Sequence, residues 1–244
     1  MNDDALVFES QIQETHWWFT GRRCLFGKII RRLGLDPDSR ILDLGSGSGT
    51  NLNLLRSMNF KNIQGLDISP TAVELCRQRG FEKVSLGNIC ETGLPSSHFD
   101  LVLATDVLEH VDDDRAALQE IRRLLKKGSS AFLAVPSFPA LWGLQDQVSF
   151  HQRRYRRGEL VKKVVESGLK PRRHRYFNFS LCPAIWLARL FLKRHAWGLK
   201  SENQINTPFL NKTLSGVFLA DIFLTEQVPV PFGVSEYCLV EPEP

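Results

Sequence analysis

A glycine-rich loop in the first quarter of the chain carries the clearest chemical signal. Residues 45–49 read Gly-Ser-Gly-Ser-Gly and follow the mostly apolar segment 40–44, which contains Asp43. Glycines at the end of a strand let the backbone approach a ligand closely, and the N-terminus of the following helix can bind its polar groups. We therefore expect a nucleotide-type site. A dinucleotide fingerprint would need Gly or Ala at position 50, so Thr50 fits a nicotinamide cofactor less well.

An acidic residue at the end of the next apolar segment is placed to bind a ribose. Asp67 lies 18 residues after Gly49, a spacing typical of a side chain that accepts hydrogen bonds from ribose hydroxyls. Ser69 can cap the helix that follows, so Asp67 is not needed for that role. This pattern predicts that Asp67 holds the sugar of a bound nucleotide.

Two histidines are candidate catalytic residues. His110 comes soon after the apolar segment 99–104, at the strand edge where ligands bind in parallel sheets, and His151 begins a basic segment. An imidazole can accept a proton from a nucleophile near neutral pH. His110 could instead be a structural residue that caps the next helix. Asp106, Glu109 and His110 could also hold a divalent cation such as magnesium, although we expect no metal.

Alternating strand and helix patterns place these residues in one fold. Apolar segments typical of buried parallel strands alternate with segments of helical periodicity five times in succession. This alternation predicts a doubly wound, mostly parallel α/β sheet. Strands are expected at 40–44, 64–68, 83–86, 99–104, 130–135, 173–179 and 235–240. Helices are expected at 21–33, a stretch ending at 56, 70–80, 112–128, 159–167, 183–194 and 209–224.

The organisation changes after residue 177. Residues 178–233 are rich in aromatic and apolar side chains, and we expect a helical insertion there, between the last two strands. Residues 1–39 are expected to form an N-terminal helical cap, and 40–177 together with 234–244 the cofactor-binding domain. Residues 151–200 hold fourteen Lys or Arg and two Glu, a net charge of +12, although the whole chain carries only +4. This asymmetry favours an anionic partner.

Composition narrows the class of protein. The chain is 43% apolar and 24% charged, as globular proteins are, and its five cysteines are scattered without metal-ligand spacing. A disulfide framework or a zinc-cysteine site is therefore not expected. The acidic start lacks the pattern of a secretory signal, and no segment is apolar for long enough to span a bilayer. We expect a cytoplasmic protein.

Ordered motifs over residues 40–136 resemble those of the class I S-adenosylmethionine-dependent methyltransferases. The string acidic-x-Gly-x-Gly-x-Gly begins at Asp43, and the segments 94–100 and 105–110 resemble the LPF…FD and D/E-V-L-E-H motifs of small-molecule members. HWWF-x-x-RR at 16–23 is similar to a bacterial subfamily often found with cell-surface polysaccharide and lipid genes. H-x-R-R-Y at 151–155 and PFG-x-S at 231–235 extend that similarity. Paired tryptophans before the core also occur in the ubiquinone-type O-methyltransferases.

The resemblance implies a fold, a cofactor and its contacts. It implies a Rossmann-like sheet of seven strands with the last antiparallel, and S-adenosyl-L-methionine as the cofactor. The implied cofactor-binding residues are Asp43, Gly45, Ser46, Gly47, Asp67, Ile68, Asn88, Ile89, Thr105, Trp18 and Arg22. Asn88 would contact the adenine amino group, and Arg22 or Arg23 would pair with the methionine carboxylate. Trp17 and Trp18 would form a lid over the cofactor, or would instead fix the N-terminal helix to the core.

Three classes of function remain open from the sequence. The first is a methyltransferase acting by in-line displacement on a small-molecule or lipid- or saccharide-linked acceptor. The second is a nicotinamide-dependent oxidoreductase, and the third a non-catalytic cofactor-binding protein. We favour the first, because the glycine loop and Asp67 are intact.

The charge pattern suggests what kind of acceptor such an enzyme would take. Arginines between 153 and 175 precede the aromatic stretch 177–192, so we expect an anionic, lipid-linked acceptor and peripheral contact with the inner membrane face. The stretch could equally be a helix that packs over the sheet. Nucleic acid is not expected, because no nucleic-acid-binding module accompanies the charge.

Overall fold

The computed structural model describes residues 3–195, 201–204 and 206–243. Seven strands form one sheet in the order β3-β2-β1-β4-β5-β7-β6. The strands are β1 (Arg40–Leu44), β2 (Asn62–Asp67), β3 (Val84–Leu86), β4 (Phe99–Thr105), β5 (Leu125–Pro136), β6 (Leu169–Phe177) and β7 (Ser235–Pro242). β7 runs antiparallel to both of its neighbours, and the other described pairs are parallel. The predicted doubly wound sheet with an antiparallel last strand is confirmed.

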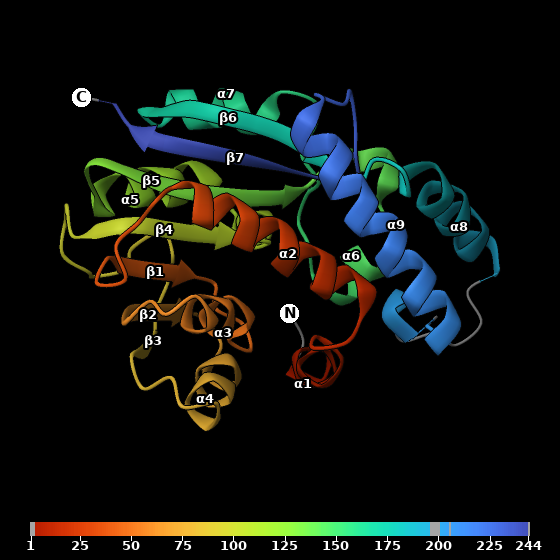
Figure 1. Cartoon of the computed structure of the whole chain (residues 1–244), viewed down its shortest axis with the longest axis horizontal. Coiled ribbons are helices and arrows are strands. Elements are labelled where there is room, and N and C mark those ends of the chain that lie inside the picture. The colour runs from red at the N-terminus through yellow and green to blue at the C-terminus, as the bar shows by residue number, and fades with distance from the viewer. Residues whose placement is uncertain (1–2, 196–200, 205, 244) are drawn as a thin grey trace.

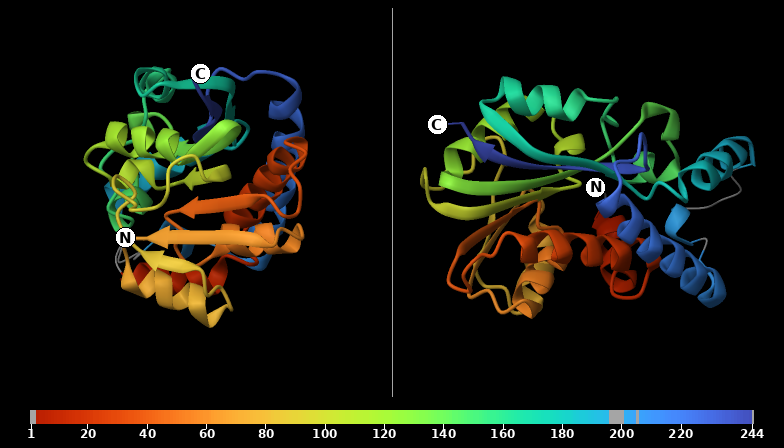
Figure 2. Two further views of the ribbon diagram at one scale, coloured as in Figure 1. Left: turned by 90° about the vertical axis from the view of Figure 1, so that its left-hand side faces the viewer. Right: turned by 45° about the horizontal axis from the view of Figure 1, so that its top comes forward.

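Helices cover both faces of the sheet (Figures 1 and 2). They are α1 (Asp3–Ile12), α2 (Trp17–Arg32), α3 (Thr50–Ser57), α4 (Pro70–Gln78), α5 (Asp114–Leu124), α6 (Leu144–Val148), α7 (Glu159–Glu166), α8 (Cys182–His195) and α9 (Pro208–Gln227). The short 3₁₀ turns are η1 (Leu108–His110), η2 (Pro139–Leu141) and η3 (Glu202–Gln204). α2 and α9 lie side by side on one face, and α5 and α7 pack together on the other.

Alternation along the strands builds a core on each face. Leu42 and Leu44 of β1 pack in the cluster that includes α5 and α7, whereas Ile41 packs with α2 and α9. Successive side chains of a strand point to opposite faces, so a strand covered on both sides must be apolar throughout. This explains why the central strands were recognisable as apolar segments.

Element boundaries differ from expectation where tertiary pairing decides them. α5 ends at Leu124, and β5 already begins at Leu125, which is buried and pairs with Phe99. Lys126, Lys127 and Gly128 therefore belong to a strand, and the prediction that they close the helix was wrong. Ser69 does cap α4 as predicted, accepting a hydrogen bond from the amide of Ala72.

The described residues between β6 and β7 are mostly helical, and their helices extend beyond the carboxyl ends of the parallel strands together with α1 and α6 (Figure 1). Thr207 caps the N-terminus of α9, because its side chain accepts a hydrogen bond from the amide of Leu210. Among the helices described, none is long and apolar enough to cross a membrane. These helices form the walls of the cavities at this edge of the sheet.

Candidate functional site

A cavity of about 220 Å³ lies at the carboxyl ends of β1, β2 and β4. We call it the loop cavity. It is lined by Leu6, Gly45, Gly47, Asp67, Ile68, Ser69, Ala72, Asn88, Ile89, Asp106, Val107, His110 and Val111. Six of the expected cofactor-binding residues lie in this lining. Ile68 is 71% exposed although it is apolar, which suits a side chain that a planar ligand would cover.

The glycine loop is shaped by close packing and by Asp67. Gly45 has φ of +71°, and a Cβ atom there would lie 2.4 Å from a methyl group of Val107, so only glycine fits. The carboxylate of Asp67 accepts hydrogen bonds from the amide of Gly47 at 2.8 Å and from the amide of Ser69 at 2.9 Å. Asp67 therefore ties the loop after β1 to the end of β2.

Asp43, Ser46 and Thr105 support this loop from inside the protein rather than lining the cavity. The Asn51 amide donates to both the Asp43 carboxylate and the Thr105 hydroxyl at 2.9 Å, and the Ser46 hydroxyl donates to the Asp43 carbonyl at 2.8 Å. Burial raises the pKa of Asp43 to about 8. These three residues, which were expected to bind the cofactor, therefore stabilise the conformation of the loop from the protein interior.

Helix α1 covers the loop cavity. Leu6 lines the cavity, and the Gln13 amide hydrogen-bonds the hydroxyls of Ser48 and Thr50 beside the glycine loop. The Arg79 guanidinium donates to the carbonyl of Ser10 at 3.0 Å. α1 lies where a lid over the loop cavity was expected, although the sequence had pointed to the tryptophans for that position.

Trp17 and Trp18 hold α2 against its neighbours instead. The Trp18 ring stacks on Phe177 and Phe218, with centroid distances of 6.3 and 5.6 Å, and the Trp17 amide donates to Asn211 at 2.7 Å. Neither tryptophan lines the loop cavity. Of the two alternatives, these contacts match the one in which the tryptophans fix the N-terminal helix to the core.

A second cavity of about 270 Å³ lies beyond the first. We call it the aromatic cavity. Its apolar lining residues are Trp17, Trp18, Phe19, Pro136, Ile185, Ala188, Leu192, Leu214 and Val234. Its polar lining residues are Glu9, His16, Arg22, Asp106, His110, Gln145, Asp146, Ser149, His151, Arg154, Arg189, Glu202, Asn203 and Ser235. Asp106 and His110 line both cavities, so the two meet there.

The arginines of the aromatic cavity are paired with carboxylates. Arg22 forms an ion pair with Asp106, Arg154 lies 2.7 Å from Asp146, and Arg189 lies 2.8 Å from Glu202. Outside the cavity, several residues of the basic segment are paired as well: Arg153 and Lys163 with Asp114, Arg172 with Glu241 and Arg173 with Glu226. Part of the positive charge expected from the sequence is therefore neutralised within the fold.

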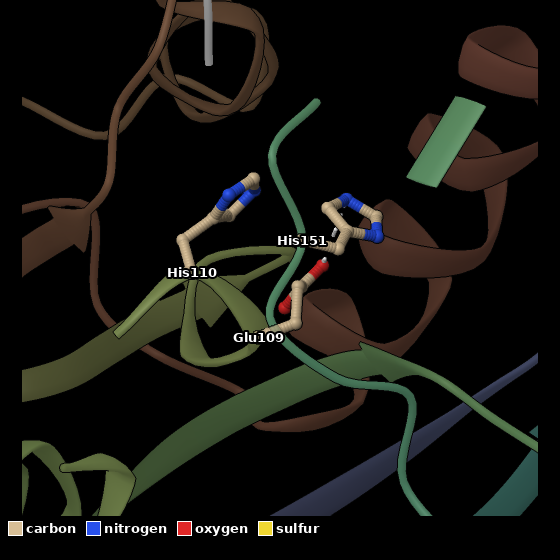
Figure 3. A group of neighbouring side chains, drawn as sticks. All are labelled: Glu109, His110 and His151. Atoms are coloured by element: carbon tan, nitrogen blue, oxygen red, sulfur yellow. Dashed lines mark ion pairs between the residues drawn. The ribbon is translucent and has the colours of Figure 1, made fainter. Parts of the chain in front are cut away.

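The two candidate catalytic histidines lie together. Their ring centroids are 4.8 Å apart, with the rings edge to face, and both line the aromatic cavity. Nδ1 of His151 lies 2.9 Å from Oδ1 of Asp146, while its Nε2 lies 3.9 Å from Oε1 of Glu109 (Figure 3). Burial, reinforced by the neighbouring His151, lowers the pKa of His110 to about 3. His110 is therefore neutral at physiological pH.

Glu109 lies beside the two histidines and completes a group of three possible metal ligands. This group differs from the one expected. Among the described residues, Glu109, His110 and His151 place one donor atom each within 4.8 Å of the others. Asp106 is not part of this group, and it forms an ion pair with Arg22. The alternative drawn from the sequence had grouped Asp106 with Glu109 and His110, whereas the structure places His151 beside those two residues.

Other residues of the cavities could not be anticipated from the sequence. Asp146, which holds His151, lies five positions before it on α6, a helix too short to predict by periodicity. Glu9 comes from α1, and its side chain accepts a hydrogen bond from Gln145 at 2.8 Å. Burial raises the pKa of Glu9 to about 7. The near-neutral pKa of Glu9 reflects tertiary packing, for which no sequence motif exists.

The sheet order, the antiparallel β7, the glycine loop after β1 and the acidic end of β2 together define a class I S-adenosylmethionine-dependent methyltransferase fold. Residues 42–133 match the family described as a methyltransferase domain. The fold and this match agree with the class that the sequence motifs resemble, the class I S-adenosylmethionine-dependent methyltransferases, whose cofactor is S-adenosyl-L-methionine.

Curated relatives match part of the chain. It is 29% identical over 143 residues to a chloroplastic 2-methyl-6-phytyl-1,4-hydroquinone methyltransferase of Arabidopsis thaliana, a match that covers 57% of this chain and 41% of the relative. It is 30% identical over 132 residues to an arsenite methyltransferase of Mus musculus, covering 43% and 35%. The chain thus spans less than half the length of either relative.

Solved structures share the fold over most of the chain. A SAM-dependent methyltransferase from Archaeoglobus fulgidus superposes with a TM-score of 0.55 at 20% identity, covering 91% of this chain and 94% of that one. Phosphoethanolamine N-methyltransferase 2 of Haemonchus contortus, solved with S-adenosyl-L-methionine, gives 0.56 at 17% identity, covering 89% and 52%. At such identities the likeness concerns the fold.

Proposed function

We propose that this protein transfers a methyl group from S-adenosyl-L-methionine, bound in the loop cavity, to an acceptor bound in the aromatic cavity. The observation that carries the proposal is the junction of the two cavities at Asp106 and His110. The bound cofactor supplies a methyl carbon activated by a positive sulfur. The protein must then hold the nucleophile in line with that carbon and exclude water, which two adjoining cavities can do.

Residues around the loop cavity have separate proposed roles toward the cofactor. Asp67 accepts hydrogen bonds from the ribose hydroxyls, while Ile68, Asn88 and Ile89 surround the adenine. Gly45 and Gly47 let the methionine part approach the backbone. The proposed role of Asp43, Ser46 and Thr105 is to stabilise the loop from the protein interior. Their hydrogen bonds support this role.

Arg22 is the proposed partner of the methionine carboxylate. It lies beside the junction, where it pairs with Asp106 and where its guanidinium lies 5.9 Å from the Trp18 ring centroid. We propose that the cofactor's carboxylate takes the place of Asp106 when it binds. Trp18 then contributes by holding Arg22 in position.

His151 is the proposed catalytic residue, with His110 beside it. Asp146 accepts from Nδ1, which leaves the Nε2 lone pair of His151 free to accept a proton. In the proposed step the acceptor's nucleophile forms a bond to the methyl carbon as the sulfur–carbon bond breaks. The nucleophile's proton passes to His151. Asp146 takes no part in this transfer beyond orienting the His151 ring. Neutral His110 can accept a hydrogen bond from the same nucleophile.

The acceptor we propose is a lipid-linked or otherwise partly apolar molecule. On α8, Ile185, Ala188 and Leu192 line the aromatic cavity, while Trp186 and Leu187 on its outer side are 42% and 59% exposed. A helix that is apolar toward both the cavity and the solvent suits an acceptor delivered from a bilayer. A cytoplasmic protein with such a helix would contact the inner face of the membrane. An anionic headgroup would meet exposed basic residues outside the cavity, such as Arg156 and Arg157.

The acceptor class can be tested with methyl-labelled S-adenosyl-L-methionine. Purified protein is incubated with the label and either a bacterial lipid fraction or an aqueous metabolite fraction. We expect label to appear in the lipid fraction and to be lost in His151→Gln. Label in the aqueous fraction alone would contradict the lipid acceptor, and label in neither fraction would contradict the transfer itself.

Membrane contact has its own test, co-sedimentation with vesicles of neutral or anionic phospholipid. We expect binding to anionic vesicles that weakens with salt and is lost in Leu187→Glu. Val165→Glu is the matched control, because Val165 is 49% exposed on α7, on the other face of the sheet. Equal binding by both variants, or none by the wild type at low salt, would contradict contact through α8.

A further inference from the structure

The burial of the Glu109 carboxylate indicates that it binds a compensating group. Its side chain is fully buried, and neither carboxylate oxygen has a hydrogen-bond partner among the described residues. An isolated buried carboxylate is costly unless a proton or a cation compensates it. Within the described part of the chain, the closest ionisable nitrogen is Nε2 of His151 at 3.9 Å, too far for a hydrogen bond.

The groups around Glu109 have the composition of a transition-metal site. Glu109 and His110 come from η1 after β4, and His151 comes from the loop after α6, so three separate donors converge from two segments (Figure 3). Their donor atoms lie within 4.8 Å of one another. Two imidazoles and one carboxylate suit zinc, manganese or cobalt better than magnesium. Three protein ligands with an open side are typical of catalytic rather than structural zinc sites.

The surroundings of His151 match those of a metal-binding histidine. Asp146 lies 2.9 Å from Nδ1, so it fixes the tautomer in which Nε2 carries the lone pair. Arg154, itself only 6% exposed, lies 2.7 Å from the same Asp146 oxygen and holds that carboxylate in place. Nε2 of His151 is thus presented toward Glu109, as coordination of one ion by both would require.

We propose that Glu109, His110 and His151 bind a divalent transition-metal ion whose open side faces the aromatic cavity. The inference rests on the proposed function in one respect: the ion would lie where the acceptor meets the methyl donor, since His110 lines both cavities. With the ion bound, His151 positions the acceptor through the metal instead of taking its proton. A hydroxyl proton is then released to water, and methyl transfer is otherwise unchanged.

The test is metal binding by untagged protein that has been freed of metal with a chelator. Zinc is titrated by calorimetry, with magnesium as the comparison ion, and the visible absorption of added cobalt reports the ligand environment. We expect one zinc per chain, a cobalt spectrum typical of nitrogen and oxygen ligands, and much weaker magnesium binding. No saturable zinc binding would overturn the proposal.

Variants assign the binding to these three residues. Glu109→Gln and His151→Ala should each weaken zinc binding at least about tenfold, whereas His98→Ala, which removes a histidine outside the site, should leave it unchanged. Thermal unfolding checks that the variants fold. Equal zinc affinity in all three variants would overturn the proposal.

Titration of the metal-free protein with S-adenosyl-L-methionine separates this inference from the proposed function. Cofactor binding without metal binding overturns the metal site alone. Metal binding without cofactor binding overturns the proposed function.

Discussion

Nδ1 of His151 lies 2.9 Å from Oδ1 of Asp146, and the buried Arg154 binds the same oxygen at 2.7 Å. Burial alone would raise the pKa of Asp146, but the hydrogen bond to His151 and the charges of Arg154 and Arg189 outweigh it and lower that pKa. One carboxylate therefore serves two purposes. It orients the candidate catalytic histidine and compensates an arginine inside the protein.

Replacement of Asp146 should reveal the second purpose as a loss of stability. In Asp146→Ala the Arg154 guanidinium loses its charged partner and keeps, among the described residues, hydrogen bonds to the carbonyls of Ser137 and Val234. Leaving a buried charge uncompensated typically costs about 3–5 kcal/mol. Urea unfolding should show a decrease of this order, and Asp112→Ala, at an exposed site, should show little. A decrease below about 1 kcal/mol would mean that Arg154 is adequately solvated without Asp146.

Glu9 should make stability depend on pH. Burial raises its pKa from 4.5 to about 7. Between these values the folded protein keeps a proton on Glu9 that the unfolded chain has released, so its contribution to the free energy of unfolding falls as pH rises. The melting temperature of the wild type relative to Glu9→Gln should therefore be higher at about pH 5 than at about pH 8. A difference that does not change with pH would show that Glu9 is solvated.

Asp67 should contribute measurably to cofactor affinity. Its removal takes away the proposed ribose contacts and also the hydrogen bond to the Gly47 amide. A hydrogen bond to a charged group contributes about 1.5–3 kcal/mol, so S-adenosyl-L-methionine should bind at least about tenfold more weakly to Asp67→Ala. Glu74→Ala, on the exposed side of α4, is the matched control for calorimetry. Unchanged affinity in Asp67→Ala would place the ribose elsewhere.

The N-terminal helix should control how long the cofactor stays bound. Deletion of residues 1–13 removes Leu6 from the loop cavity and Gln13 from Ser48 and Thr50. Dissociation of S-adenosyl-L-methionine, followed by stopped flow, should become faster while the sheet stays folded.

Trp18→Ala provides the contrast to this deletion. It removes a ring stacked on Phe177 and Phe218, so it should lower the melting temperature more than the deletion does. If the deletion leaves dissociation unchanged, α1 is not a lid.

The sequence predicted the structural features that a short run of consecutive residues determines. The central strands are apolar on both faces, and the loop after β1 needs glycine because Val107 leaves no room for a side chain at Gly45. Ser69 and Pro70 mark the start of α4 through local backbone chemistry. These features depend on a few consecutive residues, so the sheet, the loop and Asp67 could be predicted.

Features that depend on distant contacts were not accessible in the same way. Asp146 and His151 are near in sequence, but Glu109 joins them only because β4 and the loop after α6 meet at one edge of the sheet. The arginines of the basic segment looked unpaired until Asp114, Glu226 and Glu241 were brought beside them. Both the group around Glu109 and the ion pairs of the arginines depend on contacts between elements that are distant in sequence.

The most direct test of the account is calorimetry of the purified protein with three ligands: S-adenosyl-L-methionine, its demethylated product and NAD. The account predicts that the first two bind, one molecule per chain, and that NAD does not. The Asp67→Ala variant should weaken both of them together. Binding of NAD in preference to S-adenosyl-L-methionine, or no binding of S-adenosyl-L-methionine at all, would contradict the methyltransferase assignment.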